Sequence, residues 1–182
     1  IGKNPLYGPN WIIDVLPFME QQSLYNRFDL TQPISAAVNR EPRGTFVSAF
    51  ICPSDPNSQQ PFAAATDQGG DNWARGNYGA MSSLIHMQSG NFSFNKEKSA
   101  VTMMFWDGKP WTRGVMGGNL ALSMKQVEDG TSNTIVLAEL RAGVSQSDRR
   151  GIWAMGGAGA SSFWGHATDD CIGPNSCLAG AD

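Results

Sequence analysis

The sequence predicts an α+β protein: one helical region near the N-terminus, then several short strands joined by long Gly/Asn-rich loops. Helical periodicity is clearest in residues 10–28, and short apolar runs bounded by turn-forming residues recur further along the chain. The 21 Gly and 10 Pro favour turns. The length of 182 residues suits one globular domain over residues 1–182.

The composition indicates a folded protein with few charges. Charged residues make up 16% of the chain, below the usual share of about 25%. Six Trp and nine Phe supply volume for an apolar core, which argues against disorder. The formal charge is −3, and the only basic pair is Arg149-Arg150, so we expect no nucleic-acid partner.

Residues 10–28 carry a stripe of apolar side chains at helical spacing. Asn10 is a suitable N-cap. Pro17 lacks an N–H, so it should break the helix or begin a second one. We expect the following apolar residues to face the core: Ile12, Val15, Leu16, Met19, Leu24, Tyr25 and Phe28.

Several later segments resemble strands. Residues 31–45 are predicted to be a connector, and Phe46–Cys52 a short strand that Pro53 stops. Residues 56–72 and 88–113 are expected to form loops. The stretch from Trp73 to Leu84 contains two glycines and predicts a strand that another backbone approaches closely.

The motif from Asp129 to Asn133, "DGTSN", allows two interpretations. Its Thr and Ser suggest nucleophile chemistry, but a nucleophilic Ser needs a base. The only histidines, His86 and His166, show no recognisable spacing to a partner, and the motif is not a Gly-x-Ser-x-Gly elbow. We therefore favour a structural turn built on Asp129 and Gly130, and expect no catalytic residues.

The segments on either side of this turn complete the predicted strands. Residues 123–127 are expected to form a short strand or turn. Residues 134–141, "TIVLAELR", form a continuous apolar run with β-branched residues, which predicts a buried strand. Ile152, Trp153 and Met155 also suit a strand.

Three cysteines bear on redox environment. Cys171 and Cys177 bracket a Gly-Pro-Asn turn that would allow a disulfide, as expected for an exported protein. Cys52 stands alone. The alternative is that all three are buried free thiols.

Oxygen-bearing side chains near the C-terminus suggest a calcium site. Asp169, Asp170 and Asn175 surround the possible disulfide, and Ca²⁺ prefers carboxylate and amide oxygens. The spacing does not match an EF-hand, and the alternative is a solvated acidic turn. We expect no other cofactor, since no phosphate-binding loop, zinc spacing or dinucleotide motif is present.

A set of phrases taken together resembles the DUF1559 family, exported proteins abundant in planctomycetes that are also labelled solute-binding protein family 10. The resemblance covers nearly all of residues 8–155. The phrases are "GPNWIIDVLPFMEQQSLYNRFDL", "FICPSDP", "NWARGNYGA", "RGVMGGN", "VEDGTSNTIVLAELRAG" and "RGIWAM".

The resemblance implies a pilin-like head, with an N-terminal helix packed on an antiparallel sheet. Family members begin with a prepilin-like leader and an apolar helix, and end in a His-x9-Asp-Gly motif. This chain begins with Ile1, and His166 is followed at the motif's acidic position by Ser176. We therefore expect the apolar helix and the C-terminal motif to lie outside this sequence. That helix would be the protein's only membrane contact.

Three functions are weighed. The first is a non-enzymatic structural subunit of a surface filament or secretion assembly, whose partners are further copies or other pilin-like subunits. The second is an extracellular carbohydrate- or solute-binding module, in which Trp106, Trp111 and Trp164 stack on sugars. The third, a hydrolase, is favoured by isolated Ser, His and Asp alone. The resemblance implies an exported protein, located at the cell surface, in the periplasm or outside the cell.

Overall fold

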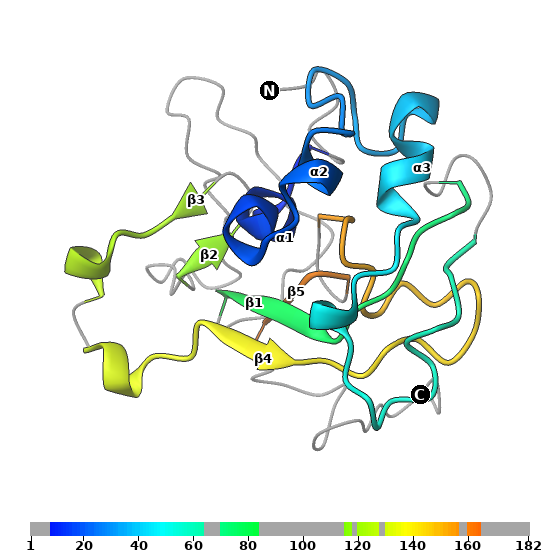
Figure 1. Cartoon of the computed structure of the whole chain (residues 1–182). Coiled ribbons are helices and arrows are strands. Elements are labelled where there is room, and N and C mark those ends of the chain that lie inside the picture. Colours follow the sequence, from blue (N-terminus) through cyan, green and yellow to red (C-terminus); the bar gives the residue numbers. More distant parts are fainter. Residues whose placement is uncertain are drawn as a thin grey trace, which may run out of the picture. The chain divides into compact units, whose positions relative to one another are not determined.

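The computed structural model describes residues 8–63, 70–83, 115–117, 120–127, 130–156 and 160–164 (Figure 1). The chain forms two compact units, residues 1–80 with 137–162 and residues 81–136 with 163–182. Short helices and a small sheet give the predicted α+β class. That residues 1–182 act as one head domain stays a prediction.

The elements are short. The α-helices are α1 (Trp11–Val15), α2 (Gln22–Tyr25) and α3 (Arg40–Arg43). The 3-10 helices are Leu16–Met19, Ala37–Asn39, Ser48–Phe50, Met124–Gln126 and Thr131–Asn133. The strands are β1 (Tyr78–Ser83), β2 (Met116–Gly117), β3 (Leu120–Ala121), β4 (Leu137–Glu139) and β5 (Ser162–Trp164).

The N-terminal helical region is divided where the sequence predicts a break. The Asn10 side chain caps α1 by accepting the backbone N–H of Ile13 at 3.1 Å. Pro17 lies in the first turn of the 3-10 helix that follows α1. That helix ends at Glu20, whose φ of 59° is left-handed, and α2 begins two residues later.

Two sequence-based expectations for residues 31–52 are wrong. The expected connector contains α3 and a 3-10 helix, and the expected strand at Phe46–Cys52 is replaced by the 3-10 helix Ser48–Phe50. The physical reason is the spacing of the buried side chains. Val47 and Phe50 are buried and three residues apart, which one helical turn satisfies and strand alternation does not.

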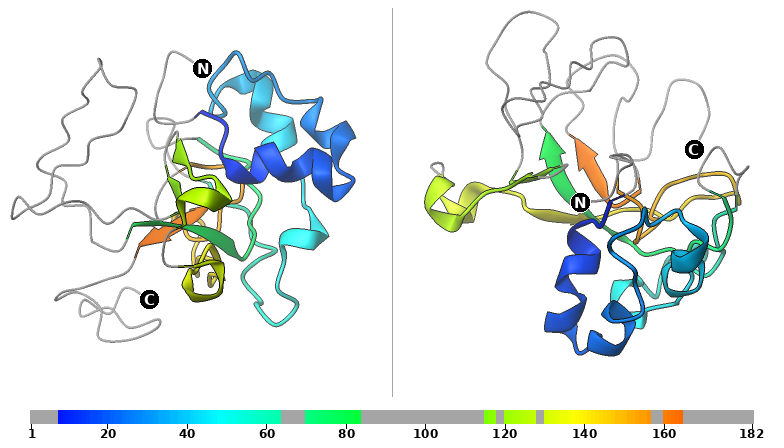
Figure 2. Two further views of the ribbon diagram at one scale, coloured as in Figure 1. Left: turned by 90° about the vertical axis from the view of Figure 1, so that its left-hand side faces the viewer. Right: turned by 90° about the horizontal axis from the view of Figure 1, so that it is seen from above.

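The main sheet has the order β4-β1-β5. β1 lies within the predicted strand region and pairs antiparallel with β4, placing Tyr78 opposite Glu139 and Ala80 opposite Leu137. β5 runs in the same direction as β1 (Figure 2), so the sheet is mixed rather than antiparallel throughout. β2 and β3 form a separate antiparallel pair.

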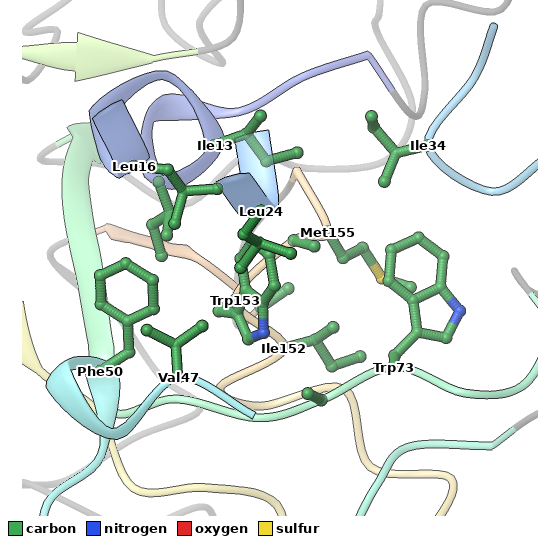
Figure 3. Close-up of a cluster of buried hydrophobic side chains, with 14 of the residues drawn as sticks. Ile13, Leu16, Leu24, Ile34, Val47, Phe50, Trp73, Ile152, Trp153 and Met155 are labelled. Carbon is green, nitrogen blue, oxygen red and sulfur yellow. The ribbon is translucent and has the colours of Figure 1, made fainter. Parts of the chain in front are cut away.

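The largest apolar core of the described residues belongs to the first unit. Trp153 is central: its ring makes an edge contact with Phe28, with centroids 6.1 Å apart, and a tilted contact with Phe50 at 5.9 Å. Side chains of the N-terminal helices point toward this cluster (Figure 3). Of the stripe predicted to face the core, Ile12, Leu16, Leu24 and Phe28 are buried, and Val15, Met19 and Tyr25 pack against them.

The apolar run at residues 152–155 is buried but is not a strand, contrary to prediction. Its only bridge among the described residues pairs Ile152 with Arg75. The backbone turns here instead of extending, since the N–H of Ile152 donates to the carbonyl oxygen of Arg149 and the N–H of Met155 to that of Ile152, each at 3.4 Å. Gly151 has φ 78°, and a Cβ there would clash with the carbonyl oxygen of Gly76. This is the close backbone approach expected for the glycines after Trp73.

Candidate functional site

The "DGTSN" motif forms a turn around Gly130. Gly130 has φ 83°, and its carbonyl oxygen accepts the backbone N–H of Asn133 at 3.1 Å and the hydroxyl of Thr134 at 3.0 Å. Ser132 is exposed within the 3-10 helix Thr131–Asn133. Asp129 lies outside the described residues. The contacts of Gly130 are those of a structural turn.

The segment before this turn is also a turn. Residues Met124–Gln126 form a 3-10 helix with a capping box, in which Ser123 and Gln126 bond each other's backbone.

The segment that follows the turn is not buried as predicted. β4 covers only Leu137–Glu139, and the aliphatic side chains of Ile135, Val136 and Leu137 are 62%, 37% and 45% exposed. β4 pairs with β1 on one side and lies at an edge of the described sheet. An edge position leaves more of each side chain in contact with solvent.

Most other predicted site residues lie outside the described part of the chain. These are the calcium candidates, the disulfide candidates and two of the loop tryptophans: Asp169, Asp170, Asn175, Cys171, Cys177, Trp106 and Trp111. Cys52 is described and is half-buried, with its sulfur 3.0 Å from the Ser54 hydroxyl oxygen.

The described residues include no group of three or more His, Cys, Asp or Glu placed to hold a metal. The described helices include none long and apolar enough to cross a membrane.

The described polar site is one that the sequence analysis missed: a carboxylate that joins three separate segments. One oxygen of Asp55 accepts the side-chain amide of Asn77 at 2.6 Å and the backbone N–H of Ala142 at 2.7 Å. The other accepts the backbone N–H of Asn57 at 2.9 Å. Asn77 in turn accepts the N–H of Cys52 at 2.9 Å. The cluster therefore ties "FICPSDP" to "NWARGNYGA" and to the end of "VLAELRAG".

The electrostatics of Asp55 follow from these donors. Burial raises the pKa of the carboxyl, but the N–H donors of Ala142, Asn57 and Asn77 and the charge of Arg141 outweigh it and lower the pKa below its ordinary value. The carboxylate is thus ionised at neutral pH and acts as an acceptor for three donors.

Two buried arginines bind backbone carbonyls. Arg75, 1% exposed, donates to the carbonyl oxygens of Gln60 and Arg150 at 2.6 Å and of Ser145 at 2.7 Å. Burial lowers the pKa of its guanidinium, and the charge of Asp148 works in the opposite direction. Arg75 therefore holds together loops that are far apart in the sequence.

Arg43 plays the same part elsewhere in this unit. Its guanidinium lies 4.3 Å from the ring centroid of Trp73 and donates to the carbonyl oxygens of Ile34 and Asp71, each at 2.9 Å. Burial lowers its pKa to about 10, so it remains charged at neutral pH. Arg43, the last residue of α3, thus joins the backbone at Ile34 to the backbone at Asp71.

A further tether fixes the start of α1. The Asn10 amide donates to the carbonyl oxygen of Trp153 at 2.7 Å and to the Ser161 hydroxyl at 2.9 Å. The Trp11 indole donates to the carbonyl oxygen of Ser161 at 2.7 Å, and the Ser161 hydroxyl donates to the carbonyl oxygen of Met155 at 2.7 Å. The beginning of the described chain is therefore held against the segment that leads into β5.

These contacts define the chemistry of the cluster. Asp55, Arg75 and Asn77 bind backbone groups of their own unit, and their polar atoms hold loops rather than present groups to a solute. A signal was present in the sequence: each lies in a Gly- or Pro-rich phrase next to aromatic or apolar residues, where a polar side chain tends to satisfy local backbone.

The protein is thus of a definite class: a small α+β protein whose first unit consists of loops held by buried polar side chains around an aromatic core. The chain belongs to the DUF1559 family. The family model SBP_bac_10, described as a protein of unknown function (DUF1559), matches residues 2–178. None of the curated proteins or solved structures compared with the chain matches it.

Proposed function

We propose that the protein is a non-enzymatic structural subunit of an exported assembly at the cell surface, in the periplasm or outside the cell. In this proposal the described residues belong to a pilin-like head. The observation that carries it is an exposed aliphatic run: Ile135 and Val136, which directly precede β4, and Leu137, the first residue of β4. Adjacent exposed aliphatic residues are typical of surfaces that another protein chain covers.

The polar cluster supports a structural rather than a chemical role. The hydrogen bonds of Asp55, Arg75 and Asn77 go largely to backbone atoms. A catalytic group must be free to exchange protons or bonds with a substrate, and these groups are occupied by the fold. The resemblance to exported pilin-like proteins agrees with this interpretation.

Sedimentation of the full-length native protein tests the proposal. Material purified from its source should form polymers or detergent-dependent oligomers, because burial of an apolar N-terminal helix would supply most of the association free energy. N-terminal sequencing and intact mass should find a methylated aromatic residue ahead of that helix. A full-length protein that stays monomeric without detergent would contradict the proposal.

The purified full-length protein also distinguishes the structural role from the alternative function. The family label and the tryptophans Trp106, Trp111 and Trp164 favour a carbohydrate- or solute-binding module. Trp164 is the last residue of β5 and not a loop residue as the sequence predicts. Saturable binding to a glycan array by a monomeric protein, with no assembly, would support that alternative.

Calcium and the disulfide are parts of the proposal that can be tested separately. Calorimetry with Ca²⁺ on oxidised protein, before and after Asp170→Asn, decides between a calcium site and a solvated acidic turn: a site gives binding heat that the variant loses. Peptide mapping without reductant should recover the Cys171–Cys177 pair. No heat at millimolar Ca²⁺ would leave Asp169, Asp170 and Asn175 as a plain acidic turn.

A further inference from the structure

The outer edge of β4 is defined by how β4 bonds to β1. The N–H of Met81 donates to the carbonyl oxygen of Val136 at 3.0 Å, and the N–H of Leu140 donates to the carbonyl oxygen of Asn77 at 2.6 Å. Backbone groups alternate in direction along an antiparallel strand. Val136, Ala138 and Leu140 therefore turn their backbone groups toward β1.

The intervening residues turn their backbone groups the other way. These are Ile135, Leu137 and Glu139, and within the described part of the chain no strand pairs with this side of β4 (Figure 1). Natural edge strands are usually protected by proline, lysine, a bulge or short length. β4 is short, but the stretch from Ile135 to Leu137 contains no proline or lysine and carries exposed aliphatic side chains.

The polarity of residues 133–139, "NTIVLAE", reads nearly the same from both ends around Val136. In an antiparallel pair of two copies about a twofold axis at Val136, Ile135 lies opposite Leu137 of the second copy. Val136 lies opposite itself. The extended register ends at Thr134, because Asn133 belongs to the 3-10 helix Thr131–Asn133. The charged Glu139 therefore faces the neutral end of this turn, and no like charges meet.

The directions of the backbone hydrogen-bonding groups are also consistent with the register centred on Val136. Ile135 and Leu137 are the residues with outward backbone groups, and this register makes them a hydrogen-bonded pair across the axis. A twofold axis requires one surface to be complementary to itself, and this edge meets that condition in both side chains and backbone.

We propose that the β4 edge pairs with the β4 edge of a second copy of this chain, joining the two sheets into one. This inference names a contact within the assembly proposed above and rests on that proposal only for its biological role. Strand pairing over so few residues buries less than the roughly 1,200 Å² of a stable interface. The pairing should therefore be concentration-dependent unless other contacts in the assembly reinforce it.

Cysteine cross-linking tests the register. In this pair the two Val136 residues form a non-hydrogen-bonded position, with Cα atoms about 4.5 Å apart, within the range that a disulfide accepts. We expect Val136→Cys to give a dimer whose peptide map contains a 136–136 linkage, distinct from any linkage of the native cysteines. Leu137→Cys is the matched control and should give no 137–137 linkage.

The same pair of variants can overturn the inference. A 137–137 linkage without a 136–136 linkage would establish a different register. Absence of both linkages, with a wild-type protein that stays monomeric in sedimentation equilibrium up to millimolar concentration, would show that the edge does not pair with itself.

A charge on the edge tests the pairing without new cysteines. Ile135→Lys should weaken dimerisation at least tenfold, because two lysines would face the apolar partner strand. Met124→Lys, at a residue 72% exposed and outside β4, is the matched control and should leave the dimer unchanged. Circular dichroism checks that both variants fold, and equal dimerisation of the two would overturn the inference.

The outcomes also separate this inference from the proposed function. Native filaments that persist in Ile135→Lys would defeat the β4 contact alone. A β4-linked dimer of a full-length protein that forms no larger assembly would defeat the filament proposal alone.

Discussion

Two apolar runs that both begin with isoleucine have opposite surroundings in this molecule. Ile135–Leu137 adjoins and enters a strand and is exposed, whereas Ile152–Met155 is buried and belongs to no strand. The second run is covered because segments distant in sequence converge on it. Apolar side chains favour burial in either run. Whether they are buried depends on which other segments of the chain pack against them.

The contacts explain the difference. Trp153 lies against Phe28 and Phe50, and its indole donates to the carbonyl oxygen of Thr45 at 3.1 Å. The run at Ile135–Leu137 is bonded to β1 on one side, and among the described residues it has no strand on the other.

The largest effect should come from removing the centre of the buried run. Trp153→Ala should lower the free energy of unfolding by about 3–5 kcal/mol, because it leaves a large cavity between Phe28 and Phe50. Ile135→Ala, at an exposed site, should change it by no more than about 0.5 kcal/mol. Urea denaturation measures both, and similar losses would break the comparison between the two runs.

A smaller loss should follow from Arg75→Met. This change keeps most of the side-chain volume but removes the guanidinium donor from the carbonyl oxygens of Gln60, Ser145 and Arg150. The last two keep one backbone N–H donor each, from Asp148 and Gly143. We expect a loss of about 3 kcal/mol. Arg27→Met removes an exposed ion pair with Glu41 and should cost less than about 1 kcal/mol. Thermal denaturation compares the two variants. If Arg75→Met and Arg27→Met have the same melting temperature, Arg75 does not hold the loops together.

Gly130→Val tests the turn that precedes the exposed run Ile135–Leu137. A β-branched residue is strained at φ 83°, so we expect a loss of about 1–2 kcal/mol. Ser132→Ala in the same turn should change stability by less than about 0.5 kcal/mol and leave any measured activity intact. Loss of an enzymatic activity in folded Ser132→Ala would refute the structural interpretation of this turn.

The smallest effect concerns Asp55 and depends on pH. Because hydrogen bonding lowers its pKa in the folded state, its contribution is fully present above the unfolded value of about 3.9 and is lost as the pH falls through the folded pKa. Asp55→Asn should therefore cost about 1 kcal/mol at pH 7 and progressively less in acid. Glu139→Gln, on exposed β4, is the control. A pH-independent difference between Asp55→Asn and wild type would contradict the role of the carboxylate.

The sequence by itself determined the features that depend on near neighbours. Asn10 caps α1 by accepting the N–H three residues ahead, Pro17 interrupts the helical region, and the apolar spacing of Ile12 and Leu16 selects a buried face. The positive φ of Gly130 also follows from local residue types, because Gly130 lies in a turn-forming motif. Membership of the DUF1559 family likewise follows from short phrases of the chain, because their order and spacing are properties of the sequence alone.

Only the tertiary structure decided which apolar runs are buried and where the polar side chains bind. The tether between Asn10 and Trp153 joins residues 143 positions apart, and the bond between Asp55 and Ala142 spans 87. No local pattern encodes such pairs. Residues 48–50 became a 3-10 turn because Val47 and Phe50 both reach the core, and Ile135–Leu137 stayed exposed because β4 lies at an edge of the described sheet. Burial is a property of the surrounding segments, and a run of residues does not carry that information alone.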